Sequence, residues 1–517
     1  MEGQNIVIET RAGNGAHNSG SGMGGCQRDG FPRELAIRAS DMSAVLDSFS
    51  SARALHDDLY VETWIQSSRR CASLNTMIVP LDAVKGWNRD PQSGNLAHDT
   101  GRFFSVIGLQ VRHQGKQAEI VWDQPIIEQP EIGILGILAK SIHGSLHFCM
   151  QAKEEPGNIG AAQLSPTVQA TYSNYSGAHG GGKPQFLEYF LDPDPDRLIF
   201  SRLQTEDGGR FLYKSNRNMI VSVGDDFPVQ LPAGFIWLTL KQISALLDRD
   251  YLFNACTRSI LSSFFWAGTR VRSGSGHVDP GDADKPHDRA AAAACPVAVE
   301  KTGPAPSESQ DLRATLQWID DQKACNHMLA KRIGLNDLQE WELDGKGFFS
   351  HKEKRFFRIV GLSVSTESRE IRTWEQPIIE NQTAGIIGLL VRNGRNGIEL
   401  LMQAKAEVGN KSAVQLGPTV QFTQCNYEGS KKLHKPFLYD EFSESRTFKV
   451  IHESRQTEEG ARFYREFHLH RVLMLPDEME IKLPADYRWL PLEHIAFLLH
   501  LGDQVNSCAR SILFCLF

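Results

Sequence analysis

The 517-residue sequence has no long apolar run, no Cys-x-x-Cys pair and no surplus of basic residues. A membrane-spanning helix needs about 20 consecutive apolar residues, and no stretch approaches that length. Residues 1–30, rich in Gly, Ser and Asn, lack the apolar core of a signal peptide. The formal charge of −7 argues against a nucleic-acid coat, which needs a basic surplus. We therefore expect a cytoplasmic protein with neither a nucleic-acid nor a membrane partner.

Several motifs that would identify a chemistry are also missing. The nine cysteines are scattered and odd in number, which is weak evidence for a disulfide framework or a zinc site. The chain lacks a Walker loop, a Gly-x-Gly-x-x-Gly turn after a strand, a His-Glu-x-x-His motif, an EF-hand loop and a Gly-x-Ser-x-Gly elbow. Metal and nicotinamide chemistry have no positive signal, and we expect no cofactor.

A long internal repeat dominates what the sequence does contain. WDQPIIE at 122–128 recurs as WEQPIIE at 374–380, which is a lag of 252 residues. MQAK at 150–153 and QTE at 204–206 recur at the same lag. This period far exceeds the ~20–50 residues of solenoid units, so it indicates the duplication of a whole domain.

Composition divides the chain around this repeat. We expect a flexible tail (1–30), a first repeat with an N-terminal extension (31–270), a linker rich in Gly, Pro, Ser and charge (271–311) and a second repeat (312–517). Within each repeat, β-branched and aromatic runs bounded by Gly or Pro predict strands. The end of each repeat turns helical: Ile243, Leu246 and Leu247 share a helical face, and further helices are expected over 254–261 and 506–513. Each copy is therefore predicted to be α+β, with a curved mixed sheet and C-terminal helices.

Polar residues inside strand-like segments are the candidates for a site, because buried polar groups must be paired with protein or with a ligand. Gln124 and Pro125 interrupt an apolar strand, which fits either a structural bulge or an amide that lines a pocket. Gln151, Lys153 and Glu155 alternate and so share one face of a strand. Either an amphipathic edge strand or a polar cleft explains that face.

Two further segments carry candidate groups. The glycine-rich turn between His179 and Lys183 allows backbone N–H groups to approach an anion, although a plain flexible loop has the same composition. QTEDGGRF at 204–211 places Glu206 near Arg210. This is either a hairpin turn with solvated salt bridges or a general acid–base carboxylate beside a diphosphate-binding arginine.

On these motifs the chain resembles the sugar-nucleotide 2,3-dehydratases of deoxysugar biosynthesis. The resemblance covers roughly residues 60–265 and 313–517, including the duplication. In the first copy it rests on HDTGRFFSVIGL, WDQPII, MQAKEEPGN, QLSPTVQATYSNY, HGGGKP, QTEDGGRF and NRN. In the second copy it rests on HKEKRFFRIVGL, WEQPII, MQAKAEVGN, QLGPTVQFTQCNY, QTEEGARF and NSCARSIL.

The resemblance implies an activity, a fold and an assembly. The substrate would be an NDP-4-keto-6-deoxyhexose, usually the dTDP-linked glucose derivative, from which the C2 hydroxyl and the C3 proton are removed. The enol formed first would tautomerise to a 3,4-diketo-2,6-dideoxy sugar. Each copy would have a Nudix-like fold, and the protein would be a homodimer. The glutamate-rich, magnesium-binding helix of Nudix hydrolases is not visible, so hydrolysis is not carried over.

The expected chemistry needs a base for the C3 proton, an acid for the departing hydroxyl and donors for the C4 oxygen. The candidates for acid–base roles are Glu206, His179, Lys153 and Glu155. The substrate-binding residues expected in the first copy are Gln124, Gln151, Thr167, Gln169, Asn174, Tyr175, Lys183, Arg202, Gln204, Arg210, Asn216 and Asn218. Those expected in the second copy are Trp374, Gln403, Lys405, Thr419, Gln421, Tyr427, Arg455, Gln456, Glu458 and Arg462.

The two copies are not equivalent. The second copy lacks the glycine run, and Asn216 and Asn218 correspond to His468 and His470. We therefore expect the first copy to be catalytic and the second to be a binding or structural relic. Two rival functions stay open: a non-catalytic nucleotide-sugar-binding or scaffold protein, and a Nudix-type diphosphate hydrolase suggested by fold analogy alone. The nucleotide base and the final sugar are not determined by the sequence.

Overall fold

The computed structural model describes residues 38–114, 119–171, 173, 183–265, 310–367, 371–395, 397–428, 433–444 and 447–517. The expected tail and nearly all of the expected linker lie outside these residues, as do the candidates Asn174, Tyr175 and His179. Below, the first copy means the described residues up to 265 and the second copy means those from 310 onward. No helix in the described ranges is long and apolar enough to cross a membrane.

The two copies contain corresponding elements in the same order. The first copy comprises α1 (Ala39–Ser50), α2 (Asp58–Arg70), β1 (Asn75–Val79), β2 (Trp87–Arg89), β3 (Leu96–His98), β4 (Ser105–Gln114), β5 (Glu119–Glu128), β6 (Gly133–Ile142), β7 (Ser145–Glu154), β8 (Ala162–Ser165), β9 (Val168–Ala170), α4 (Glu188–Leu191), β10 (Leu198–Thr205), β11 (Phe211–Leu212), β12 (Ser215–Ser222), β13 (Phe235–Leu238), α5 (Leu240–Ala245) and α6 (Ala255–Leu261). The second copy comprises α8 (Gln310–Ala324), β14 (Met328–Ile333), β15 (Trp341–Leu343), β16 (Phe349–His351), β17 (Phe357–Ser365), β18 (Thr373–Asn381), β19 (Gly385–Gly394), β20 (Gly397–Ala406), β21 (Val414–Gly417), β22 (Val420–Thr423), α9 (Gln424–Tyr427), α10 (Tyr439–Glu444), β23 (Lys449–Thr457), β24 (Phe467–Met474), β25 (Tyr487–Pro491), α11 (Leu492–Leu501) and α12 (Ser507–Leu513).

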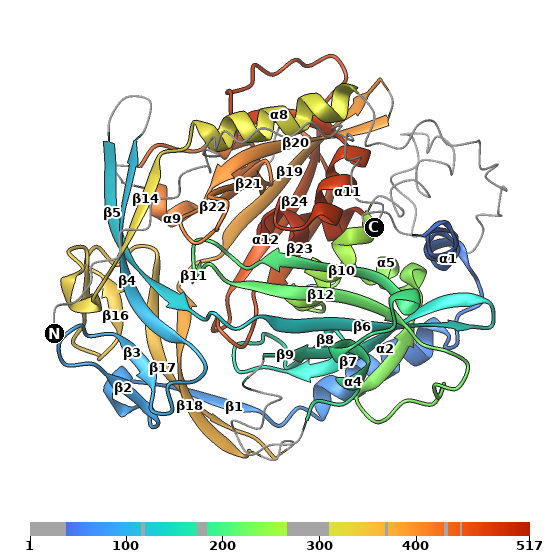
Figure 1. Ribbon diagram of the computed structural model, residues 1–517, viewed down its shortest axis with the longest axis horizontal. Coiled ribbons are helices and arrows are strands. Elements are labelled where there is room, and N and C mark those ends of the chain that lie inside the picture. The colour runs from blue at the N-terminus through green and yellow to red at the C-terminus, as the bar shows by residue number, and fades with distance from the viewer. Residues whose placement is uncertain are drawn as a thin grey trace, which may run out of the picture.

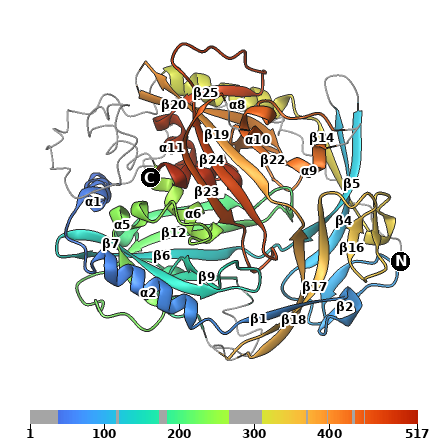
Figure 2. The same ribbon diagram turned by 180° about the vertical axis from the view of Figure 1, so that it is seen from behind.

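Each copy builds a larger mixed sheet with one strand order. In the first copy the order is β10-β12-β6-β7-β13, with β8 on β7 and β9 on β6. In the second copy the order is β23-β24-β19-β20-β25, with β21 on β20 and β22 on β19. The pairs β12–β6 and β24–β19 are parallel, while the other pairs are antiparallel. These two sheets lie side by side around a central group of helices (Figures 1 and 2). The prediction of a duplicated α+β fold is confirmed.

The copies exchange a strand in their smaller sheets. β14 of the second copy pairs with β4 of the first, and β1 of the first copy pairs with β17 of the second. Because β1 and β14 are corresponding strands, each smaller sheet is completed by the other copy. The repeats are therefore intertwined rather than joined end to end. The sequence repeat gave no sign of this exchange.

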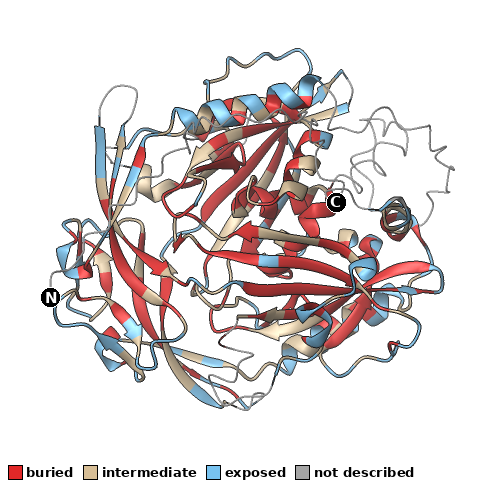
Figure 3. Cartoon of the chain, in the orientation of Figure 1, coloured by how far each residue is buried: buried red, intermediate tan, exposed pale blue. Residues whose placement is uncertain are grey.

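The late helices pack at the contact between the copies, and the helices predicted over 254–261 and 506–513 are confirmed. Asn254 caps α6 by accepting from the Thr257 N–H, and Asn506 caps α12 in the same way. Asn is favoured at this position because its side chain satisfies a backbone donor that the helix leaves free. Both helices are buried, whereas α8 and the outer end of β5 are exposed (Figure 3).

Buried arginines tie these two helices together reciprocally. Arg258 Nε donates to Ser511 Oγ over 2.7 Å, and Arg510 Nε donates to Ser259 Oγ over 2.8 Å. The predicted helical face of Ile243, Leu246 and Leu247 was partly wrong. Helix α5 ends at Ala245, because the N–H of Leu246 closes a turn onto the carbonyls of Ile243 and Ser244.

Candidate functional site

A cavity of about 730 Å³ lies against the larger sheet of the first copy. This volume is within the range of small-molecule sites, roughly 300–1,000 Å³. The first copy supplies most of the wall, and the second copy supplies Ile371, Trp374, Glu375, Gln376, Glu459, Ala461 and Arg462. The candidate site is therefore built by both copies.

Two loops place the second-copy residues in this cavity. The loop after β23 meets the turn after β7, where the Gly157 N–H donates to the Gly460 carbonyl over 2.7 Å. The reciprocal loop after β10 meets the second copy, where the Gly409 N–H donates to the Gly208 carbonyl over 2.7 Å. A Cβ atom on Gly157 would lie 1.7 Å from the carbonyl oxygen of Phe463, so the close approach requires glycine. The loop that follows QTE in the second copy therefore contributes Glu459, Ala461 and Arg462 to the cavity against the first-copy sheet.

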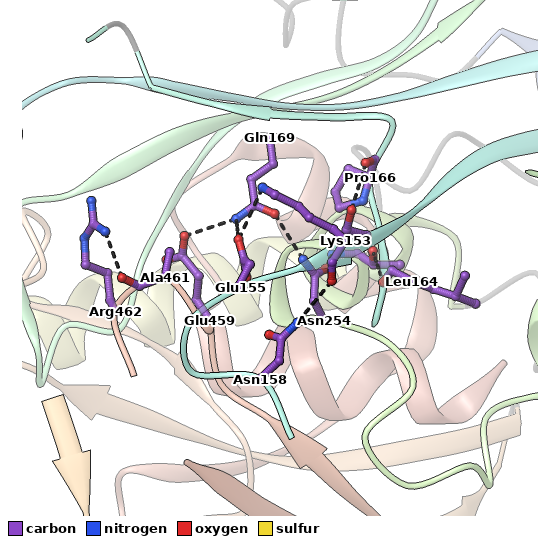
Figure 4. A network of polar contacts seen from close by, with 12 residues as sticks. Lys153, Glu155, Asn158, Leu164, Pro166, Gln169, Asn254, Glu459, Ala461 and Arg462 are labelled. Carbon is purple, nitrogen blue, oxygen red and sulfur yellow. Dashed lines mark hydrogen bonds and ion pairs between the residues drawn. The ribbon is translucent and has the colours of Figure 1, made fainter. Parts of the chain in front are cut away.

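One side-chain amide joins two carboxylates inside the cavity. Gln169 Nε2, on β9, donates to Glu155 Oε1 over 2.9 Å and to Glu459 Oε1 over 3.2 Å (Figure 4). Gln169 Oε1 accepts in turn from Asn254 Nδ2 over 3.0 Å, which fixes the orientation of the amide. Lys153 Nζ lies 3.2 Å from Glu155 Oε1. The second carboxylate oxygen of Glu155 is buried and has no hydrogen-bond partner among the described residues.

Burial and neighbouring negative charge alter the titration of Glu459. Burial first, and then the charges of Glu206 and Glu155, raise the pKa of Glu459 to about 7. A carboxyl group with this pKa exchanges its proton near neutral pH, as a general acid or base must. Glu206 accepts a hydrogen bond from Asn216 Nδ2 over 2.5 Å.

Basic groups on the same wall suit an anionic ligand. Arg462 lies with its guanidinium carbon 4.3 Å from the centre of the Phe104 ring, and its Nη2 donates to Gln129 Oε1 over 3.2 Å. The Nε of Arg462 is buried without a partner. Lys153, Lys183 and Lys214 also line the cavity. Arginine and lysine are the residues that hold phosphate groups.

The structure brings many of the expected first-copy residues to this wall. Those that line the cavity are Gln151, Lys153, Glu155, Thr167, Gln169, Lys183, Glu206 and Asn216. Thr167 is also committed to the sheet, because its hydroxyl donates to the Cys149 carbonyl and accepts from the Leu138 N–H. Of the expected second-copy residues, Trp374 and Arg462 line the cavity.

Five expected first-copy residues lie elsewhere, because their polar groups bind the protein itself. Gln124, on β5, donates to the Gly209 carbonyl in the loop after β10 of the same copy. Its second-copy counterpart, Gln376, lines the cavity. Arg202 and Gln204 donate to carbonyls of α11. Asn218 donates to Ser259, and Arg210 lies over the Phe357 ring, on the side of the second copy. Arg202 and Arg210, which were expected to hold the diphosphate, therefore do not line the first-copy cavity, and the crossing loop places Arg462 there instead.

The remaining second-copy candidates do not line this cavity either. Most of them bind neighbours within the second copy, and Arg455 pairs with Asp250 of the first. This group comprises Gln403, Lys405, Thr419, Gln421, Tyr427, Arg455, Gln456 and Glu458.

The corresponding position in the second copy has the opposite charge. Glu466 stands where the first copy has Lys214, and His468 stands where it has Asn216. His468 Nε2 lies 3.3 Å from Glu458 Oε1 and 3.6 Å from Glu466 Oε1. Burial is the main cause that raises the pKa of Glu458 to about 8 and that of Glu466 to about 7. The position in the first copy is therefore better suited to an anion than its counterpart in the second copy.

Sequence reasoning missed several polar residues of the cavity, among them Glu459, Lys214 and Gln129. The first had a signal, because Glu459 directly follows the predicted Glu458, but it was not among the predicted residues. The other two had none. Within the described ranges, no cluster of three or more His, Cys, Asp or Glu residues is arranged to hold a metal ion.

Comparison with known proteins gives one consistent result. The family model described as NDP-hexose 2,3-dehydratase matches residues 58–264 and again 312–516. A protein of Saccharopolyspora spinosa named dTDP-4-dehydro-6-deoxy-alpha-D-glucopyranose 2,3-dehydratase is 36% identical over 87% of this chain and 89% of its own length. Proteins of the same name from Amycolatopsis orientalis and Streptomyces violaceoruber are 34% identical (94% of this chain, 96% of theirs) and 35% identical (84% and 91%). The chain therefore belongs to the NDP-hexose 2,3-dehydratase family, whose members are carbon–oxygen lyases.

Proposed function

We propose that the first-copy cavity binds a dTDP-linked 4-keto-6-deoxy-D-glucose and that its residues eliminate the C2 hydroxyl with the C3 proton. The substrate is the one that the names of the three relatives specify. The observation that supports this site most directly is the pair of carboxylates, Glu155 and Glu459, held by one amide beside basic groups.

The elimination is balanced within the substrate. The C4 ketone acidifies the C3 proton, so a base removes it and the electron pair is delocalised onto the C4 oxygen. The C2–O bond then breaks, and the departing hydroxyl takes a proton to leave as water. The product is an enol with a C2–C3 double bond, which tautomerises to the 3,4-diketo-2,6-dideoxy sugar.

The environments of the two carboxylates divide the roles. Glu155, paired with Lys153 and with one free oxygen, is the base for the C3 proton. Glu459, with its pKa raised to about 7, is the acid that protonates the departing C2 oxygen. Enzymes obtain both an acid and a base from one residue type by placing two carboxyl groups in different surroundings. Gln169 holds the two at a fixed separation. Glu206 acts on Glu459 through its charge, and a role for His179 stays a prediction.

The diphosphate is the remote handle that orients the sugar. Arg462, Lys214 and Lys183 hold it against the overall charge of −7. Because Glu466 replaces Lys214 in the second copy, the first copy is the catalytic one.

The test compares matched variants of the two copies. Glu155→Gln and Glu459→Gln should each lower kcat about 100- to 10,000-fold, as expected for the loss of a general base or acid. Both should still bind dTDP. The counterparts Glu407→Gln and Asp207→Asn should retain activity within a few-fold. Equal losses in both copies would refute a single first-copy site.

The product separates this function from its two rivals. The protein is incubated with dTDP-4-keto-6-deoxyglucose, and the dicarbonyl product is trapped and identified. Binding without turnover would indicate a scaffold, and release of nucleoside monophosphate would indicate a Nudix-type hydrolase. We further propose that each copy is Nudix-like and that the protein is a cytoplasmic homodimer, on the strength of the family resemblance. Light scattering on the full chain tests the dimer.

A further inference from the structure

A cluster of rings lines the same cavity next to Arg462. It consists of Trp87, His98, Phe103 and Phe104, which come from β2, β3 and the turn before β4. The ring centres of Trp87 and Phe104 are 4.6 Å apart, those of Trp87 and His98 are 5.5 Å apart, and those of His98 and Phe103 are 4.7 Å apart. Trp87, His98 and Phe103 are only half-buried, so they offer ring surface to the cavity.

Arg462 connects this ring cluster with the carboxylates. Its guanidinium lies over Phe104, and it belongs to the same loop as Glu459, whose pKa its positive charge lowers. In a sugar nucleotide the diphosphate lies between the sugar and the nucleoside. With the sugar at the carboxylates and the diphosphate at Arg462, the nucleobase reaches the ring cluster.

Gln129 supplies a polar group at this end of the cavity. Its side chain is 3% exposed, and its Oε1 is committed to Arg462, which has only donors to offer. The amide orientation is therefore fixed, with Nε2 as a donor. That Nε2 is buried and has no hydrogen-bond partner. A buried donor without an acceptor is unfavourable, so a ligand carbonyl at this position would stabilise the complex.

We propose, resting on the function above, that the ring cluster stacks the nucleobase and that Gln129 Nε2 donates to its C4 carbonyl. Thymine and uracil present an acceptor at C4, whereas cytosine presents an amino donor there, which would face another donor. Gln129 would thus select a pyrimidine with a C4 carbonyl. Stacking on the rings contributes affinity without distinguishing the pyrimidines.

The decisive variant is Gln129→Glu, which keeps the shape and still accepts from Arg462 but replaces the donor with an acceptor. Dissociation constants for dTDP and dCDP are measured by calorimetry on the full chain. Wild type should bind dTDP more tightly than dCDP. In Gln129→Glu the ratio of the two affinities should move toward dCDP by about 10- to 100-fold, the size expected when a buried polar group loses its partner. The matched control is the second-copy counterpart Asn381→Asp, which should leave the ratio unchanged.

A second variant tests the stacking independently. Phe103→Leu should weaken dTDP and dCDP by similar factors, about 10-fold, while Phe356→Leu in the second copy should not. An equal loss of both nucleotides in Gln129→Glu would overturn the proposal, because it would place Gln129 at the diphosphate. An unchanged affinity for both nucleotides in Phe103→Leu would overturn the stacking.

Failure here is distinguishable from failure of the proposed function. If the protein prefers dTDP over dCDP but forms no dicarbonyl product, the proposed dehydration is refuted and the proposed nucleobase site is still supported. If the protein dehydrates dTDP- and dCDP-linked substrates equally well, only the proposed nucleobase site is refuted.

Discussion

The side-chain amide of Gln169 donates to the carboxylate of Glu459 over 3.2 Å, across the boundary between the two copies. This hydrogen bond joins a strand of the first repeat to a loop of the second. The candidate site is thus built from both repeats of the duplicated chain. Tests of the site must therefore include residues from both repeats.

Replacing Gln169 with Leu should lower kcat about 100-fold with little change in KM. The Gln169 amide aligns the two carboxylates that act on the sugar and lies away from the residues proposed to hold the diphosphate. A small loss of alignment strongly lowers the rate of the chemical step. Steady-state kinetics separate the two parameters. Gln421→Leu is the matched control, because Gln421 makes the corresponding bond to Glu407 over 3.2 Å. A rise in KM with unchanged kcat would assign Gln169 to substrate binding instead.

Replacing Lys214 with Met should raise KM about 10-fold, because the cavity loses a cation that opposes Glu206 and Glu459. The effect should diminish as ionic strength increases. The control is Glu466→Gln at the corresponding second-copy position, which should leave KM unchanged. Salt-independent loss of kcat alone would contradict an anion-binding role.

The pH profile of kcat/KM should fall above about pH 7, because Glu459 must be protonated to act as the acid. The negative charge of Glu206 helps to raise the pKa of Glu459. Glu206→Gln should therefore shift the alkaline limb to lower pH while leaving its shape intact. A limb that stays in place would show that Glu459 does not set it.

Thermal stability should fall as the pH rises from 6.5 to 8. The folded pKa values of Glu459 and Glu466, about 7, and of Glu458, about 8, are raised above the unfolded value near 4.5. The stability they contribute is present below 4.5 and is lost as pH rises through the folded pKa values. His468 does not oppose this change, because its pKa is lowered to about 3 and its contribution is complete above 6.5. Tm measured across this range should fall less steeply in Glu466→Gln, and an equally steep fall would refute the assignment.

Cutting the chain between the copies should not separate them. β1 and β14 are exchanged, so each half holds a strand of the other. A protease site inserted near residue 285 should give two fragments that co-elute in native buffer and keep activity. An uncut protein with the same insertion is the control. Separation of the fragments without denaturant would contradict the intertwined arrangement.

Local patterns were the part of this protein that sequence could predict. The repeat lag located the duplication, and the pattern at the end of each repeat located the two buried helices. Alternation correctly grouped Lys153 with Glu155, which both line the cavity although β7 ends at Glu154. Each of these is a local pattern or the recurrence of one, so it can be recognised without knowing which distant residues are in contact.

The composition of the site was decided only by tertiary structure. QTEDGGRF and QTEEGARF are nearly equivalent as sequences, and nothing in either indicates that each loop crosses to the other copy. The crossing arises from the exchanged strands and from close glycine contacts such as Gly157 with Gly460, which are long-range packing effects. The sequence by itself therefore determined that two copies of one domain carry a sugar-nucleotide dehydratase, while packing decided that Arg462 and Glu459, rather than Arg210 and Asp207, face the first-copy cavity.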